Sequence, residues 1–96
     1  MQMHNPPHPG EFIRDVYLTP HDISIRRLAS SLGVAPSTVA RLINGLNAVS
    51  PEMALRLSVV LGRSPESWLK LQHNYDLWVA RQHVDLSMIQ PLHMRK

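Results

Sequence analysis

The stretch LASSLGVAPSTVARLING, residues 28–45, constrains the fold of this chain more than any other segment. Two short apolar runs at helical spacing are separated by Gly33, which can adopt the left-handed backbone that ends a helix and turns the chain. Ala29 is small enough for a close helix crossing. The residues expected to hold the two helices together are apolar: Leu28, Leu32, Val34, Val39 and Leu42. This spacing predicts a helix-turn-helix, in which two helices cross at roughly 90–120°.

The second helix of such a motif can enter the major groove of DNA, with its N-terminal residues nearest the base edges. Here it is expected to open near Pro36 and to end at Asn44 and Gly45. The candidate DNA contacts are the polar and turn residues on its exposed side and just beyond it: Pro36, Ser37, Thr38, Arg41, Asn44 and Asn47. Hydroxyl groups can contact bases or phosphates, Arg41 can pair with guanine, and Asn44 can bind adenine or a phosphate. Each residue taken singly also fits a solvated helix position.

The charge pattern coincides with this motif. The formal net charge is only +3, but no acidic residue lies between Asp22 and Glu52, whereas Arg26, Arg27 and Arg41 fall within that window. This favours a DNA-binding motif over an ordinary helical hairpin in an all-α core. Arg26 and Arg27 are also DNA-contact candidates, because cations in the first turn of a helix oppose its dipole and indicate a nearby anion. Either a DNA phosphate or a surface acid such as Asp22 can supply that anion.

Apolar periodicity and capping residues predict an all-α chain of five helices. The first helix should start near Pro9 and be broken by LTPHD at residues 18–22. Its expected core-facing residues are Phe12, Ile13, Val16 and Tyr17. Ser24 should cap the second helix, while SPE triplets at 50–52 and 64–66 should open the last two. The expected organisation is an irregular lead-in over 1–8, the helix-turn-helix domain over 9–83 and a C-terminal arm over 84–96.

Composition narrows the function classes. The 96 residues, 44% of them hydrophobic, suit one globular domain, and the absence of cysteine excludes disulfides, thiolate metal sites and cysteine nucleophiles. No phosphate loop, zinc motif or catalytic triad is present, so we expect no enzyme and no cofactor. His4, His8 and His21 lack the fixed spacing of a metal site. No apolar run approaches the roughly 20 residues of a membrane span, and no signal peptide is evident, so a soluble, unexported protein is expected.

Residues 28–45 resemble the helix-turn-helix motif of Xre/Cro-type repressors. Together with HPGEF at 8–12 and SPEMALRLSVVLGRSPESWLKLQHNYDLW at 50–78, they are similar to the HigA-type (VapI-like) antitoxins of bacterial toxin–antitoxin operons. The resemblance covers roughly residues 8–80. It implies a five-helix Xre/lambda-repressor-like domain and a cytoplasmic homodimer that binds a palindromic operator in its own promoter. It also implies neutralisation, by direct binding, of a HigB-like toxin, a RelE-like ribonuclease that cleaves mRNA.

One position departs from that pattern. The family usually carries serine or another polar residue where Ala35 stands, so the second motif helix lacks a favoured N-cap, worth about 1 kcal/mol. Pro36 can compensate by setting the backbone of the first turn. Base contacts at this end of the helix are therefore the least certain to follow the family.

Aromatic and acidic residues outside the motif suggest protein contacts. Core and dimer contacts are expected from Trp68, Leu69, Tyr75 and Trp78, with contributions from His73, Leu77 and the segment from Val84 to Met94. Glu11 and Asp15 lie four apart on the first helix, and can either face a basic toxin or form a solvated face beside Arg14. Two alternatives to an antitoxin remain open: a stand-alone Xre-type repressor without a toxin, and an interaction module that has lost DNA binding.

Overall fold

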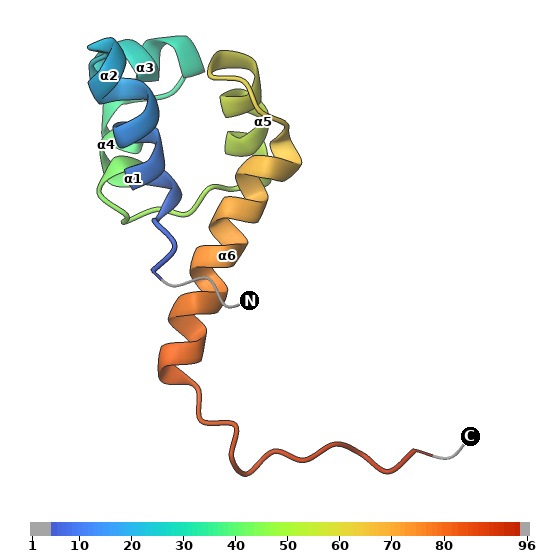
Figure 1. Ribbon diagram of the computed structural model, residues 1–96. Coiled ribbons are helices and arrows are strands. Elements are labelled where there is room, and N and C mark those ends of the chain that lie inside the picture. Colours follow the sequence, from blue (N-terminus) through green and yellow to red (C-terminus); the bar gives the residue numbers. More distant parts are fainter. Residues whose placement is uncertain (1–4, 95–96) are drawn as a thin grey trace.

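The computed structural model describes residues 5–94, which fold entirely into helices and connecting loops (Figure 1). The helical elements in chain order are α1 (Pro9–Ile13), η1 (Arg14–Leu18), α2 (Thr19–His21), α3 (Ile25–Leu32), α4 (Pro36–Ile43), α5 (Pro51–Val60) and α6 (Pro65–His83). The first three run on from one another without a break, so the expected all-α architecture of five helical segments is confirmed. No helix in the described part of the chain is long and apolar enough to cross a membrane.

The first helical segment differs from the sequence prediction. The helix does end within LTPHD, but only at the last residue of this stretch, because it continues through the π-helical turn η1 into α2 and stops at Asp22, which is in the left-handed conformation. The Thr19 N–H donates to the Arg14 carbonyl five residues back. This wider turn adds a residue and rotates the buried face. Val16 is consequently 43% exposed, and Leu18 takes its place in the core at 5% exposure.

The buried core gathers side chains from every helical segment except α2. Its members are Ile13, Leu18, Leu28, Ala29, Leu32, Val39, Leu42, Ile43, Val49, Ala54, Leu57 and Trp68. The expected helix-turn-helix core residues are among them, apart from Val34, which is half-buried and packs against the cluster. Trp68 is completely buried, and its indole N–H donates to the Gly62 carbonyl at 2.9 Å. The prediction of Trp68 as a dimer contact is therefore wrong, because its ring is used inside its own protomer.

Three of the four long helices begin on a serine. The hydroxyls of Ser24, Ser50 and Ser64 each accept a hydrogen bond from the backbone N–H three residues on, at 3.0–3.1 Å. Such caps satisfy one of the amide groups that a helix leaves unpaired at its start. The helix starts read from the sequence at these three positions are confirmed.

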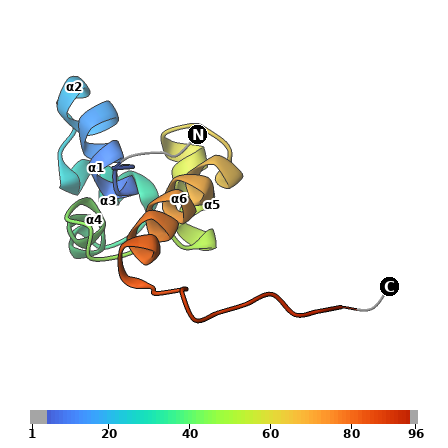
Figure 2. The same ribbon diagram turned by 60° about the horizontal axis from the view of Figure 1, so that its bottom comes forward.

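The distal half of α6 and the chain after it project from the body. Figures 1 and 2 show the first half of α6 beside α5, the second half extending beyond the other helices, and the chain then leading away from them. Every described residue of the C-terminal arm, 84–94, is exposed. The described residues consequently extend 55 Å in one direction and about half that in the other two, 26 and 25 Å.

Candidate nucleic-acid interface

The turn between α3 and α4 is fixed by its backbone. Gly33 ends α3 with φ of 74°, and the Val34 N–H returns to the Ala29 carbonyl at 3.1 Å. Arg56 of α5 donates to the Leu32 carbonyl at 2.7 Å and pairs with Glu52 at 3.0 Å, so it caps the end of α3 from outside the motif. Sequence reasoning missed Arg56, because nothing in the local pattern links it to a carbonyl far back in the chain.

The exposed side of α4 carries three of the candidate DNA contacts. Ser37, Arg41 and Asn44 are exposed and lie at positions i, i+4 and i+7, which share one face of a helix. Pro36 is also exposed, at the start of this helix. Thr38 and Asn47 are half-buried, and together they line a cavity of about 320 Å³ between α4 and the start of α5. The structure thus presents the polar side of α4 to solvent, as a groove-binding helix requires.

Three exposed arginines of α3 and α4 have no carboxylate partner within residues 5–94. Arg26, Arg27 and Arg41 are exposed. Among residues 5–94 the ion pairs are Arg14 with Asp15 and Arg56 with Glu52. The surface pair with Asp22 considered for Arg26 and Arg27 is therefore not formed, and all three guanidinium groups are available to an external anion.

The N-terminal end of α4 is left without a side-chain cap. Ala35 occupies the N-cap position, and only its backbone carbonyl takes part, accepting from the Thr38 N–H at 3.0 Å and the Val39 N–H at 3.4 Å. Pro36 follows at the first helical position, where its fixed φ suits a helix start. The missing cap predicted from Ala35 is confirmed.

The C-terminal end of α4 is held tightly against α1. Gly10 is buried, and a Cβ added to it would overlap the backbone carbonyl of Leu42 and crowd the Cα of Ile43. Only glycine allows α1 to approach so closely. This explains the third residue of HPGEF, whose structural role the sequence did not reveal.

The loop after α4 is tied to α6 by a buried amide. Gln72 is 4% exposed; its side-chain oxygen accepts from the Val49 N–H at 2.8 Å, and its side-chain nitrogen donates to Asp76 at 2.9 Å. Both ends of the amide group are thereby satisfied, as burial requires. Gln72 was also missed, since a single glutamine within a polar helix carries no signal of its distant partner.

His8 links the start of α1 to the same region. Its Nδ1 accepts from the Gly10 N–H at 2.9 Å as the N-cap of α1, and its ring meets Tyr75 edge-on at 4.9 Å between centroids. Burial lowers the pKa of His8, an effect opposed by the carboxylates of Asp76 and Glu11. The neutral ring suits its role as hydrogen-bond acceptor.

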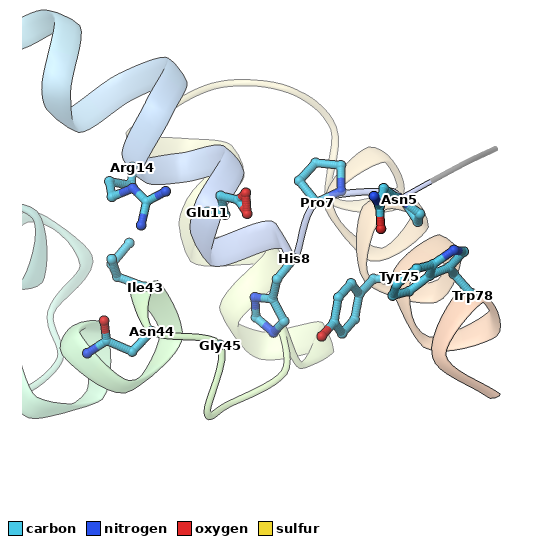
Figure 3. Close-up of a pocket in the computed structure, with 11 residues that line it drawn as sticks. Asn5, Pro7, His8, Glu11, Arg14, Ile43, Asn44, Gly45, Tyr75 and Trp78 are labelled. Carbon is cyan, nitrogen blue, oxygen red and sulfur yellow. The ribbon is translucent and has the colours of Figure 1, made fainter. Parts of the chain in front are cut away.

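These elements enclose a cavity of about 580 Å³, shown in Figure 3. Its lining includes His8, Glu11, Arg14, Asn44, Tyr75 and Trp78; we call this cavity the aromatic cleft. In Figure 3 the α6 rings stand on one side, with Ile43, Asn44 and Gly45 at the end of α4 opposite them. The predicted DNA contact Asn44 thus lines the same cleft as Tyr75 and Trp78, which were predicted to contact a second protomer.

The other predicted protein-contact residues are distributed unevenly. Leu69 is half-buried and packs against the core, whereas Leu77 is 52% exposed and His73 is also exposed. Asp15 pairs with Arg14 at 3.0 Å on the solvated side of the first helical segment. Over residues 5–94 no group of histidine and acidic side chains is placed to hold a metal ion; His4 lies outside the described residues.

Comparison with known proteins agrees with this geometry. A family model described as helix-turn-helix matches residues 13–68. The chain belongs to the helix-turn-helix family. It is 44% identical over 92 residues to the uncharacterised HTH-type transcriptional regulator YddM of Escherichia coli, covering 96% of this chain and 97% of the relative. The matched residues include α3 and α4, whose apolar residues at the helix crossing are buried and whose polar side is exposed.

Solved structures show which helix-turn-helix proteins this chain resembles in fold. The antitoxin GraA superimposes with a TM-score of 0.87 at 41% identity, over 94% of this chain and all of the other. The Pseudomonas aeruginosa antitoxin HigA, solved with the higBA promoter, superimposes with a TM-score of 0.80 at 34% identity, over 92% and 99% of the two chains. The resemblance to HigA-type antitoxins with an Xre-type fold is thereby confirmed for most of the chain's length.

Proposed function

We propose that this helix-turn-helix protein is the DNA-binding antitoxin of a HigBA-type toxin–antitoxin module, a homodimer that represses its own operon. The observation that carries the DNA-binding part is the polar face of α4, where Arg41 is exposed and has no carboxylate partner in the part of the chain that the structure describes. The HigA relative whose structure contains promoter DNA supports the same use of this fold.

In this proposal α4 enters the major groove. Ser37 and Thr38 approach base edges or phosphates, Arg41 donates a bidentate pair to a guanine, and Asn44 contacts an adenine or a phosphate. Arg26 and Arg27 at the start of α3 bind phosphates, which set the register of the protein on the duplex. Asn47, in the loop after α4, contributes a further contact to the DNA backbone. Two protomers on a palindromic operator double these contacts.

The DNA-binding proposal is tested by titrating duplex DNA from upstream of the chain's own gene, with fluorescence anisotropy as the readout. Replacing Arg41 by alanine should weaken operator binding by about 1–3 kcal/mol. Lys70→Ala, an exposed cation on the first half of α6, is the control and should have little effect. Wild-type affinity should fall steeply with salt, because phosphate binding releases counterions. An affinity that does not depend on salt would contradict the proposal and favour the alternative of an interaction module that has lost DNA binding.

The antitoxin part rests on the resemblance and on relatives named as antitoxins. It is tested by co-expressing the chain with the reading frame beside its gene and scoring growth, mRNA cleavage and co-purification. An adjacent basic ribonuclease, held in a stable complex and silenced by the chain, is the expected result. Operator binding without such a toxin would instead identify a stand-alone Xre-type repressor.

A further inference from the structure

The C-terminal arm exposes a dense set of apolar side chains. Six large ones in its described part are between 55% and 88% exposed: Val84, Leu86, Met88, Ile89, Leu92 and Met94. Single exposed apolar residues are ordinary, but a contiguous series in one short segment marks an interaction surface. The arm itself is held only by local turns, such as the Ser87 N–H on Asp85 at 3.0 Å.

The aromatic cleft offers aromatic rings on which such side chains can pack. Its volume of about 580 Å³ lies in the range of sites that accept small ligands or peptide side chains. Tyr75 and Trp78 are half-buried on one wall and lie 6.4 Å apart between ring centroids. Aromatic side chains of this kind are common anchors for apolar partners.

We propose that the C-terminal arm of a second copy of this chain occupies the aromatic cleft, so that two protomers exchange arms across their α6 helices. This deepens the homodimer of the proposed function and rests on it. Apolar side chains of the arm pack on Tyr75 and Trp78 of the partner. Asn44 forms the opposite wall, so the exchanged arm also supports the end of the DNA-reading helix.

Reach and direction fit a second copy. The arm leaves α6 away from its own body (Figures 1 and 2). Val84 lies about 9 Å beyond Trp78 along the helix axis, at 1.5 Å per residue. When the distal halves of two α6 helices pack antiparallel, each arm therefore starts beside the cleft of the other protomer. Residues 84–94, fully extended, span up to about 36 Å, and the exposed Leu77 supplies apolar contact between the helices.

Charge also favours this occupant. Asp15 and Asp76 lie next to residues of the cleft, which itself contains Glu11, so carboxylates outnumber the single guanidinium of Arg14. The arm is flanked by basic residues: Arg81 in the last turn of α6, and Arg95 and Lys96, which lie outside the described residues. The arm itself carries the carboxylate of Asp85. Its basic flanks, at Arg81 and at Arg95 and Lys96, are attracted to this acidic rim.

The first test compares two full-length variants by sedimentation equilibrium. The arm variant replaces Leu86, Met88, Ile89 and Leu92 by serine. The control replaces Leu55 and Val59 of α5 by serine as well. These two residues are 58% and 85% exposed and lie outside the cleft. We expect the dimer dissociation constant to rise at least tenfold in the arm variant and to change less than twofold in the control, with unchanged helix content by circular dichroism. Unchanged association of the arm variant, or equal weakening of both, would overturn the proposal.

The second test uses the absence of cysteine from the sequence. Glu11→Cys and Leu92→Cys variants are purified separately, one with a size tag, then mixed and oxidised. A disulfide joining tagged to untagged chains, in higher yield than either variant forms alone, is the expected result. A double variant that links only within one chain would show the arm in its own cleft and overturn the exchange.

The outcomes separate this inference from the proposed function. A dimer whose association requires the arm but which binds no DNA would refute the proposed repressor function and support the exchange of arms. A DNA-binding dimer whose association ignores the arm would refute the exchange and keep the repressor. Retained dimerisation with loss of toxin binding in the arm variant would assign the arm to the toxin, against the proposal.

Discussion

The two ends of α4 are built in opposite ways. At the N-terminal end, Ala35 provides no side-chain cap and Ser37 is exposed. At the C-terminal end, Gly10 of α1 touches the helix backbone, and Gln72 of α6 holds the loop that follows. We call the N-terminal end the free end, because we expect it to adjust when a ligand binds. The C-terminal end is the anchored end, because its contacts fix the position of the helix in the fold.

The first residues proposed to read DNA bases, at the helix start, therefore lie at the opposite end of α4 from the contacts that fix the helix in the fold. Pro36 and Ser37, at the helix start, are exposed and follow an N-cap position without a side-chain hydrogen bond, so we expect this end to adjust to DNA at small cost. The anchored end is where substitutions should damage the fold. Variants at the two ends consequently test the comparison directly.

The largest effect is expected at Gly10. Replacement by alanine puts a Cβ into the Leu42 carbonyl and pushes α1 away from α4, at a cost of about 3 kcal/mol in the free energy of unfolding. Urea denaturation measures it. Gly62→Ala is the control: its φ of 92° strains an L residue, but nothing lies within 4 Å of the new Cβ, so about 1–2 kcal/mol is expected. Equal costs would mean that close approach is unimportant at the anchored end.

Gln72 should come next. Leucine at this position leaves the buried Val49 N–H without an acceptor and should destabilise the fold by about 1–3 kcal/mol. Gln82→Leu, on the exposed last turn of α6, makes the same chemical change without a buried partner and should be nearly neutral. Operator affinity, corrected for the unfolded fraction, should fall only for Gln72→Leu, because the loop holding Asn47 loses its anchor. If both variants behave alike in unfolding, the amide does not hold this loop.

A smaller effect, of the opposite sign, is expected at the free end. Ala35→Ser supplies the cap found at the other three helices and should stabilise the protein by about 1 kcal/mol, through a hydrogen bond from the Thr38 N–H. Ser50→Ala, which removes such a cap, should cost a similar amount. Thermal unfolding of the two variants beside wild type gives both values. No gain from Ala35→Ser would show that Pro36 already fixes the turn.

The sequence correctly predicted where both ends of α4 lie, but it revealed only the local features of the free end and not the contacts that hold the anchored end. The missing cap at Ala35, the left-handed Gly33 and the serine caps are local features, fixed by residues within a turn of one another, and each was correctly predicted. The core face of α3 and α4 followed in the same way from helical periodicity.

The anchored end depends on contacts between distant segments. Nothing near Gly10 shows that α4 passes within van der Waals distance, and nothing near Gln72 shows that its acceptor faces Val49. The π-helical turn before Pro20 was missed for a related reason, because one added residue rotates every later side chain and moves Val16 out of the core. The stripe from Trp68 to Trp78 predicts core and dimer contacts together, because periodicity alone does not show where along a stripe burial ends; Trp68 is in the core only.

The smallest effect concerns pH and the anchored end alone. Burial lowers the pKa of His8 from its usual 6.5, against the pull of Asp76 and Glu11, so the unfolded chain takes up the proton first as pH falls. The contribution of neutral His8 is therefore complete above pH 6.5 and is lost as pH falls towards the lowered pKa of the folded state. His8→Asn keeps a side-chain acceptor for the Gly10 N–H but cannot titrate. Urea unfolding from pH 8 to pH 5 should thus show wild type losing stability relative to His8→Asn. The same pH series on Ala35→Ser should parallel wild type, since no histidine caps the free end; a constant difference between wild type and His8→Asn would remove His8 from the anchor.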